Sequence, residues 1–226
     1  MKPYYEQDGI VVYHGDCREV LPTLEPVDSV ISDPPYGDET HLGARTGDGD
    51  EVLVDFASIT AEELSAVISG INARRWLVAT MEWRHIADFE KNTPSGWRFV
   101  RFGIWVKPNG SPQFTGDRPG TGWEGICVLH KDVLGKMRWN GGGHNLVITA
   151  NKENGPHRTM KPQSLMKRLV HWFSDDGETV LDPFMGIGST LVAAKELGRR
   201  AIGIEIEERY CEIAAKRLAQ GVLQFK

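Results

Sequence analysis

The stretch 178–220 constrains the fold more than any other part of the chain. It starts with a short apolar run, passes through a turn that contains Gly186 and Gly188, and continues as a helical pattern, a second apolar run and a second helical pattern. The preceding residues also alternate short apolar runs with helical patterns. Helices are expected there at 60–74, 83–91 and 162–173. This alternation is typical of a parallel α/β sheet with helices packed on it.

At 226 residues the chain is long enough for one sizeable α/β domain. It contains no run of 18 or more apolar residues, so the sequence predicts no membrane span. Its start, MKPYYEQDG, lacks the apolar core of a signal peptide, which favours a cytoplasmic location. The net charge of −5 argues against nucleic-acid binding through the whole surface, although a local basic face is compatible with it.

The three cysteines lie far apart in the chain, at Cys17, Cys127 and Cys211. Their number is odd, no CxxC pair is present, and the seven histidines form no HxxxH or HExxH pattern. The sequence therefore indicates neither a disulfide framework nor a zinc site, and no metal is expected. The cysteines are expected to be buried.

The turn VLDPFMGIGST, residues 180–190, lies between an expected strand and an expected helix. Glycines there let a ligand approach the backbone, and the start of the helix offers N–H groups to an anion. Glu205 stands nineteen positions after Gly186, where a carboxylate can accept hydrogen bonds from a ribose diol. No Lys follows the glycines, so a P-loop is excluded, and Leu191 replaces the third glycine of a dinucleotide fold. A nucleotide-like ligand is expected, with NAD as the weaker alternative.

A second turn, DPPY at 33–36, follows the apolar run VDSVIS. Its two prolines fix φ and donate no N–H, so the chain can neither continue a sheet nor start an ordinary helix there. The corner therefore holds one carboxylate, a rigid backbone carbonyl and one aromatic ring at a fixed point. A proline-rich turn without function is the plain alternative.

Together, the DPPY corner and the DPFMGIGST turn resemble the motifs of the S-adenosylmethionine-dependent DNA amino-methyltransferases, which methylate the exocyclic nitrogen of adenine or cytosine. The corner precedes the cofactor turn, an order similar to that of the permuted group usually labelled beta. The segment 157–170 resembles the one that lines the methionine end of the cofactor in that group. The segment 12–21 resembles the strand end whose acidic residue, here Asp16, meets the adenine of the cofactor.

The resemblance implies a single methyltransferase domain over residues 1–226 with a Rossmann-like class I methyltransferase fold, which is α/β, with a mostly parallel seven-stranded sheet and helices on both faces. The strand at 179–182 would be central. It would be flanked on one side by strands at 200–205 and 10–14, and on the other by strands at 27–32, 76–81, 98–106 and 123–130. Asp33 and Gly186 would then lie at the carboxyl ends of adjacent strands, where ligands of open α/β sheets bind.

The same resemblance assigns the site residues. Asp33 and the carbonyl of Pro34 would accept hydrogen bonds from the target amine, and Pro35 would keep the corner rigid. Tyr36 would stack on a base that is flipped out of the DNA. The cofactor, S-adenosyl-L-methionine, would be bound by Asp16, Asp33, Thr159, Lys161, Asp182, Phe184, Gly186, Gly188, Ser189, Thr190 and Glu205.

The expected cofactor contacts differ along the molecule. Asp16 and Glu205 are expected to hold the adenosine, and a turn or helix-cap role is the alternative for each. Phe184 is expected against the adenine ring, with packing beneath the turn as its alternative. Lys161 and Thr159 are expected near the methionine carboxylate, and a solvent-exposed lysine is the alternative there.

The first residue of the corner favours adenine N6 as the methylated atom, since aspartate is commoner in adenine-specific members and serine in cytosine-N4 members. Cytosine N4 remains the alternative, because both bases present a similar amine. Relatives that act on RNA or on protein glutamine more often carry asparagine and the opposite motif order. A catalytically silent homologue that only binds nucleic acid would have lost Asp33 or the glycine turn, and both are intact.

Two segments lie outside these motifs. Residues 37–60 carry six carboxylates and a single arginine, Arg45, and are expected to form a mobile loop after the corner. Residues 107–150 mix basic and aromatic residues with glycines and are expected to form a small target-recognition insertion. Double-stranded DNA is the favoured partner, and the short recognition segment leaves a homodimer as one way to complete the grip on it.

Overall fold

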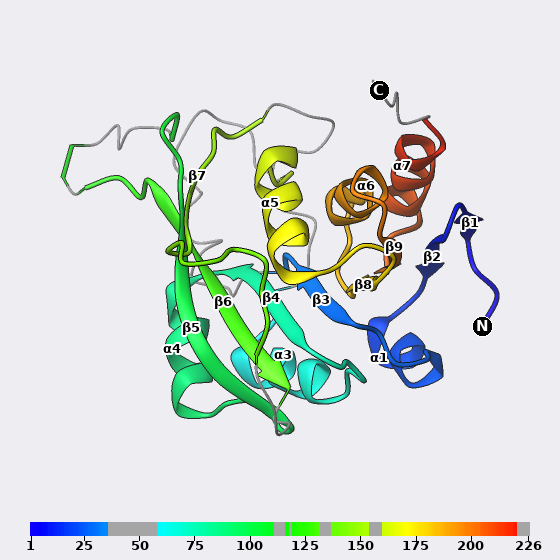
Figure 1. The fold of residues 1–226 in the computed structure, drawn as a ribbon, viewed down its shortest axis with the longest axis horizontal. Helices are drawn as coiled ribbons and strands as arrows, with labels where there is room; N and C mark the ends of the chain where they lie inside the picture. The colour runs from blue at the N-terminus through cyan, green and yellow to red at the C-terminus, as the bar shows by residue number, and fades with distance from the viewer. Residues whose placement is uncertain (36–57, 111–115, 118, 132–136, 154–159, 221–226) are drawn as a thin grey trace.

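The computed structural model describes residues 1–35, 58–110, 116–117, 119–131, 137–153 and 160–220. Within these ranges the strands form one nine-stranded sheet in the order β1-β2-β9-β8-β3-β4-β6-β5-β7 (Figure 1). The strands are β1 (Tyr5–Gln7), β2 (Ile10–His14), β3 (Ser29–Ser32), β4 (Trp76–Met81), β5 (Trp97–Val106), β6 (Trp123–Lys131), β7 (Val147–Thr149), β8 (Thr179–Asp182) and β9 (Arg200–Glu205).

The seven expected strands are all present in the expected arrangement. β8 is central, with β9 and β2 on one side and β3, β4, β6 and β5 on the other. The strands from β2 to β4 in this order run parallel, whereas β6 is antiparallel to both of its neighbours. Two short strands that the sequence pattern did not predict extend the sheet. β1 forms a hairpin with β2 through Asp8 and Gly9, both with positive φ, and β7 pairs with the end of β5.

Helices cover both faces of the sheet. They are α1 (Cys17–Val20), α3 (Ala61–Ser69), α4 (Trp83–Lys91), α5 (Gln163–Phe173), α6 (Ser189–Glu196) and α7 (Glu208–Ala219), with a 3-10 turn η1 (Leu21–Thr23) after α1. Helices α5, α6 and α7 pack on one face, and α1, α3 and α4 pack on the other (Figure 1). β4 is buried along its whole length because helices cover it on both sides. None of the described helices has the length and apolar character needed to cross a membrane.

Local sequence signals explain the helix that follows the DPPY corner in the described chain. Thr60 caps α3 with its hydroxyl, which accepts from the N–H of Glu63 at 3.1 Å, and the Glu63 carboxylate accepts from the N–H of Thr60 at 2.9 Å. The helix ends at Ser69, earlier than the expected 60–74. It stops there because the next residues run beside the start of β3, where Val27 N–H donates to Asn72 O at 3.0 Å.

The expected burial of the cysteines is confirmed. Cys17, Cys127 and Cys211 are free thiols in the interior of the protein. Burial raises the pKa of the Cys17 thiol to about 11 and that of Cys211 to about 12, so both are protonated at neutral pH. These cysteines therefore belong to the packing of the two core layers.

Candidate active site

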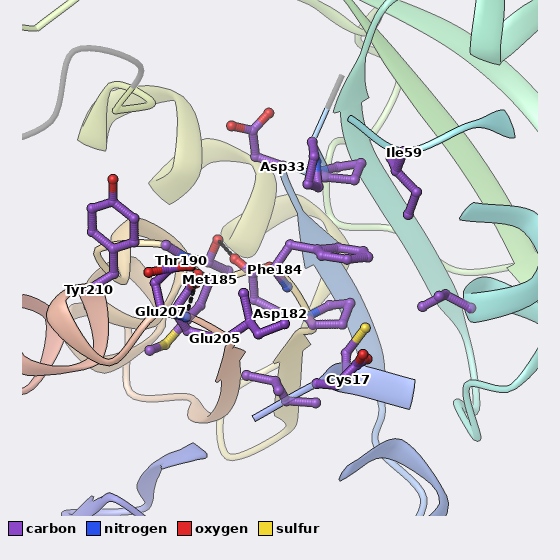
Figure 2. Close-up of a pocket in the computed structure, with 18 of the residues that line it drawn as sticks. Cys17, Asp33, Ile59, Asp182, Phe184, Met185, Thr190, Glu205, Glu207 and Tyr210 are labelled. Atoms are coloured by element: carbon purple, nitrogen blue, oxygen red, sulfur yellow. Dashed lines mark hydrogen bonds between the residues drawn. The ribbon is translucent and has the colours of Figure 1, made fainter. Parts of the chain in front are cut away.

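A cavity of about 720 Å³ opens at the carboxyl ends of the parallel strands (Figure 2). Its volume lies in the range of small-molecule binding sites. Most of the residues expected in the site line it, namely Asp16, Asp33, Pro34, Pro35, Lys161, Asp182, Phe184, Gly186, Ser189, Thr190 and Glu205. Tyr36 and Thr159 lie outside the described residues. Residues distant in the sequence therefore meet in one cavity.

The cavity forms where the connections of the sheet diverge. β3 and β8 are neighbours, and from β8 the chain passes through α6 to β9 on one side. From β3 the chain continues towards α3 and β4 on the other side. Asp33 and Gly186 follow these two neighbouring strands, as expected. Such a switch point leaves a crevice that side chains of neither crossover fill.

The glycine turn brings backbone to the cavity wall. Gly186 has φ of +51°, and a Cβ added there would meet no atom within 4 Å. Its N–H donates to Glu205 Oε2 at 2.9 Å, and the N–H of Glu207 donates to Glu205 Oε1 at 2.8 Å. Gly188 serves packing: its φ is +79°, and a Cβ would lie 3.1 Å from that of Ala214. Gly188 thus lets α6 and α7 approach beneath the turn.

Asp182 holds the turn against the corner. Its side chain is 2% exposed. Oδ1 accepts from Ser32 Oγ at 2.6 Å and from the N–H of Phe184 at 3.1 Å, and Oδ2 accepts from Thr190 Oγ1 at 2.6 Å. Burial raises the pKa of Asp182 to about 6, although these hydrogen bonds oppose the rise. The carboxyl connects β3, β8 and α6 beneath the cavity floor.

We expect Asp182→Asn to fold and to lose part of the pH dependence of stability. The folded-state pKa of about 6 exceeds the ordinary 3.8, so the folded protein holds this proton more tightly than the unfolded chain does. The free energy of unfolding therefore falls as the pH rises from about 4 through 6. Urea denaturation without cofactor should show the asparagine variant gaining about 1 kcal/mol relative to the native protein between pH 5 and pH 8. An equal stability difference at both pH values would contradict this.

Asp33 stands at the end of β3 with its side chain 27% exposed. Oδ1 accepts from Thr80 Oγ1 at 2.6 Å, and Oδ2 accepts from Lys161 Nζ at 2.7 Å. Burial raises the pKa of Asp33, while the ammonium of Lys161 and the hydroxyl of Thr80 oppose that rise. Each carboxylate oxygen has a second lone pair. The oriented carboxylate can therefore still accept a hydrogen bond from a ligand.

Three residues with two expected roles each are now placed. Asp16 caps α1 by accepting from the N–H of Arg18 at 2.8 Å, forms an ion pair with the Arg18 guanidinium, and also lines the cavity. Phe184 packs against the core and lines the cavity as well. Lys161 is buried, with 8% of its side chain exposed, so it is no solvent-exposed lysine. Its ammonium faces Asp33 and Glu124.

The sequence motifs did not include the apolar wall or Thr80. Cys17, Leu21, Ile59 and Val67 line the cavity from the side of α1 and α3. Figure 2 places Cys17 and Ile59 on opposite sides of Phe184. Spacing within the chain gives no signal for such a wall, since it depends on how the helices dock. Thr80, in the otherwise apolar β4, is a polar residue that could have been singled out as a strand-end hydrogen-bond donor.

The residues present suit a nucleoside-like ligand. Carboxylates of Asp16 and Glu205 follow the neighbouring strands β2 and β9, where they can accept from hydroxyl or amine groups. Phe184 and the apolar wall offer surface for a ring. The open space over Gly186 lets a ligand lie against the backbone.

Comparison with known proteins identifies the kind of site. The N6/N4 family model described as DNA methylase matches residues 132–216. A type II methyltransferase, M2.LlaDCHI of Lactococcus lactis subsp. cremoris, is 26% identical over 97% of this chain and 93% of its own length. M2.DpnII of Streptococcus pneumoniae is also 26% identical, over 96% of this chain and 92% of its own. The resemblance to the S-adenosylmethionine-dependent DNA amino-methyltransferases is confirmed.

Solved structures of amino-methyltransferases share the fold. M1.HpyAVI in complex with S-adenosylmethionine is 27% identical, covers 91% of this chain and 98% of its own, and has a TM-score of 0.70. A DNA modification methylase of Thermus thermophilus, TTHA0409, complexed with S-adenosyl-L-methionine, is 25% identical over 92% of both chains with a TM-score of 0.67. The cytosine-N4-specific PvuII methyltransferase has a TM-score of 0.72 at 14% identity, which shows the fold alone. The class I methyltransferase fold is thereby confirmed.

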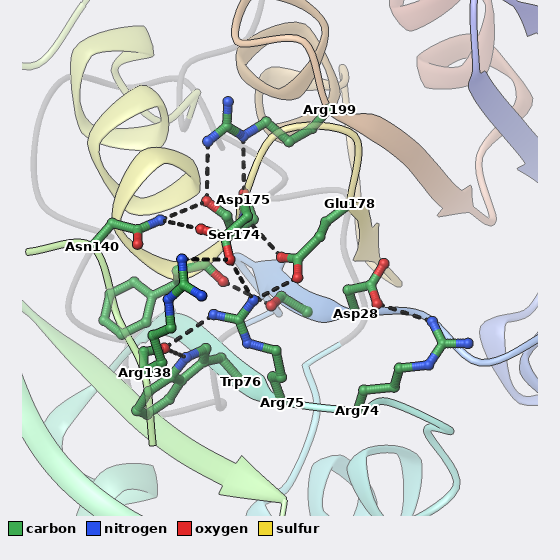
Figure 3. Close-up of polar contacts among 12 residues, drawn as sticks. Asp28, Arg74, Arg75, Trp76, Arg138, Asn140, Ser174, Asp175, Glu178 and Arg199 are labelled. Atoms are coloured by element: carbon green, nitrogen blue, oxygen red, sulfur yellow. Dashed lines mark hydrogen bonds and ion pairs between the residues drawn. The ribbon is translucent and has the colours of Figure 1, made fainter. Parts of the chain in front are cut away.

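A separate polar cluster lies at the opposite edge of the sheet (Figure 3). Arg75, which precedes β4, pairs with Asp175 at 3.1 Å and with Glu178 at 2.5 Å, and donates to the carbonyl of Arg138 at 3.0 Å. Asn140 donates to Asp175 Oδ1 at 2.8 Å. Part of the expected recognition segment 107–150 is therefore anchored far from the cavity, and β6 and β7 of that segment belong to the sheet.

Proposed function

We propose that this amino-methyltransferase transfers a methyl group from S-adenosyl-L-methionine to the exocyclic N6 amine of adenine in DNA. The observation that carries the proposal is the meeting of Asp33 with the glycine turn in one cavity at the switch point of the sheet. This places a hydrogen-bond acceptor for an amine beside a cradle for a nucleoside. The family resemblance supplies the reaction that such a pair performs.

The proposed chemistry requires an acceptor-only corner. When bound, S-adenosylmethionine supplies a methyl group on a sulfonium for the amine to attack. The amine of adenine is a poor nucleophile because its lone pair is delocalised into the ring. Asp33 and the carbonyl of Pro34 would accept from the two N–H bonds and favour a tetrahedral nitrogen. The prolines contribute no competing N–H.

The cofactor assignments are proposals of the same kind. Asp16 and Glu205 would accept from the adenosine moiety, and Phe184 would lie against its ring. Gly186, Ser189 and Thr190 would meet the ligand at the start of α6, while Asp182 and Gly188 would support the turn from below. These placements are supported by the cavity lining and by the contacts of Glu205 and Asp182. Thr159 would complete the methionine end, as the resemblance implies.

The proposed substrate is double-stranded DNA with the target base flipped out, stacked on Tyr36. Recognition of the flanking sequence would come from the parts of 107–150 that are not in the sheet and from the acidic segment 37–60, with a second subunit as a further contributor. Action on a bacterial genome, as the type II relatives suggest, corresponds to a cytoplasmic location. The intact Asp33 and glycine turn argue against a silent nucleic-acid-binding homologue.

The methylated base is tested by nucleoside analysis. Unmethylated genomic DNA is incubated with the protein and S-adenosylmethionine, digested to nucleosides and analysed by mass spectrometry. N6-methyladenine is the expected product, because the corner begins with aspartate. N4-methylcytosine would keep the mechanism and overturn the base. Methylated RNA or protein glutamine, without methylated DNA, would overturn the substrate.

A further inference from the structure

A chain of alternating charges extends from Asp33 away from the glycine turn. Lys161 Nζ lies 2.7 Å from Asp33 Oδ2 and 3.4 Å from Glu124 Oε2. Glu124 is in turn paired through Oε1 with the ammonium of Lys107. The side chains of both lysines are 8% exposed and that of Glu124 is 18% exposed. Four charges thus lie in a row, with Asp33 at the end that reaches the cavity.

The row is balanced in charge. Each inner member, Lys161 and Glu124, lies between two partners of opposite sign, and the four charges sum to zero. An unbalanced charge at this depth would be costly, because the interior solvates charges poorly. Burial alone would lower the pKa of Lys161, but Asp33 and Glu124 outweigh it and raise that pKa, so the ammonium is retained.

The fold brings the four charges together from separate elements. Lys107 follows β5, Glu124 lies in β6 opposite Trp105, and Lys161 precedes α5. The ammonium of Lys107 lies 4.8 Å from the centre of the Trp105 ring, and its backbone N–H donates to Gly122 O at 2.8 Å. Glu124 and Lys107 are therefore fixed by the β5–β6 pair.

We propose that Lys107 and Glu124 are positioning residues that act through Lys161 to hold Asp33 as an oriented carboxylate for the target amine. The inference rests on the proposed function, in which Asp33 accepts from that amine. Lys107 and Glu124 touch neither base nor cofactor; they fix the ammonium that fixes Asp33. Lys161 is thereby a partner of the reacting corner.

The proposal predicts how the charges influence one another. Among the described residues, the groups that face Asp33 are the Thr80 hydroxyl from β4, the ammonium of Lys161, the carboxylate of Glu124 and, from the end of β8, Asp182. The negative charge of Glu124 raises the pKa of Asp33, and Lys107 partly neutralises that charge. Loss of Glu124 should therefore lower the pKa of Asp33, and loss of Lys107 should raise it.

Carbon NMR of protein labelled at the aspartate carboxyl carbons tests this without cofactor or DNA. The Asp33 signal is assigned by its loss in Asp33→Asn. The pKa of Asp33 should rise in the order Glu124→Gln, the double variant Lys107→Met/Glu124→Gln, native protein, Lys107→Met. The double variant keeps the net charge at zero, so it retains a test even where a single variant unfolds. Titration curves of Asp33 that coincide in the double variant and the native protein would overturn the proposal.

Methyl transfer supplies a second readout. The acidic limb of the pH profile of kcat should move to lower pH in Glu124→Gln and to higher pH in Lys107→Met, with the KM for cofactor unchanged. At neutral pH we expect kcat to fall about tenfold in Lys107→Met through misplacement of the carboxylate. Lys107→Arg, which retains the charge, should restore most of the rate. The exposed pair Lys167–Glu196, 2.6 Å apart, provides a matched control whose variants should leave kcat unchanged.

The two readouts separate the inference from the proposed function. A native protein that transfers no methyl group to DNA, yet shows the expected order of Asp33 titrations, would refute the proposed function and support the positioning of Asp33 by the row of charges. A native protein that methylates DNA, with an Asp33 titration indifferent to Glu124 and Lys107, would support the function and refute that positioning role.

Discussion

Asp33→Asn is expected to lower kcat for methyl transfer about a thousandfold while leaving the affinity for S-adenosylmethionine close to that of the native protein. The amide presents only one acceptor oxygen, and its NH₂ would compete as a donor with the target amine. Thr80 and Lys161, which now donate to the carboxylate, would constrain the amide oxygen further. The measurement is single-turnover transfer of labelled methyl groups to DNA, with cofactor binding followed by calorimetry.

Asp28→Asn is the matched control for this change. Asp28 makes comparable contacts at the opposite edge of the sheet, accepting from Arg74 at 2.9 Å and from the N–H of Thr179 at 2.9 Å. It undergoes the same carboxylate-to-amide change far from the cavity, so its methyl-transfer rate should equal that of the native protein. Equal rates for Asp33→Asn and Asp28→Asn would exclude Asp33 as the acceptor of the target amine.

Glu205→Gln is expected to weaken binding of S-adenosylmethionine about 10- to 100-fold. The carboxylate fixes the turn by accepting from the N–H groups of Gly186 and Glu207, and it is proposed to accept from the ribose as well. A hydrogen bond to a charged group contributes about 1.5–3 kcal/mol, and a glutamine cannot accept at both positions. Each 1.4 kcal/mol is about tenfold in affinity.

The pattern of the loss distinguishes Glu205 from Asp33. In Glu205→Gln the defect should lie in the cofactor Kd and KM, and kcat should largely recover at saturating cofactor. Isothermal titration calorimetry measures the first and saturation kinetics the second. Glu212→Gln, on the exposed surface of α7, is the matched control and should bind as the native protein does. An unchanged Kd in Glu205→Gln would rule out its role in holding the adenosine.

Sequence reasoning reached the parts of the site that are encoded locally. The DPPY corner and the glycine turn were predictable because prolines and glycines restrict the backbone wherever they stand. The position of Glu205 followed from the length of one helical crossover between β8 and β9. The central strand order followed from the family resemblance.

The remaining features depend on contacts between distant segments. β1 and β7 have three residues each, too few to show a period. The approach of Glu124 to Lys161 requires the register of β6 against β4 and β5, which no local pattern fixes. The helix-cap role of Asp16 was foreseen as an alternative, and the structure combines it with a place in the cavity wall. The apolar wall depends on the docking of α1 and α3.

Transfer of an isotopically labelled methyl group tests the central claim most directly. The protein is incubated with unmethylated DNA and S-adenosylmethionine that carries a fully deuterated methyl group, and the nucleosides are analysed by mass spectrometry. The account predicts a methyl group on the exocyclic amine of adenine that retains all its deuterium, and its loss in Asp33→Asn. DNA bases that remain unlabelled, with a protein that is folded and binds the cofactor, would contradict the account.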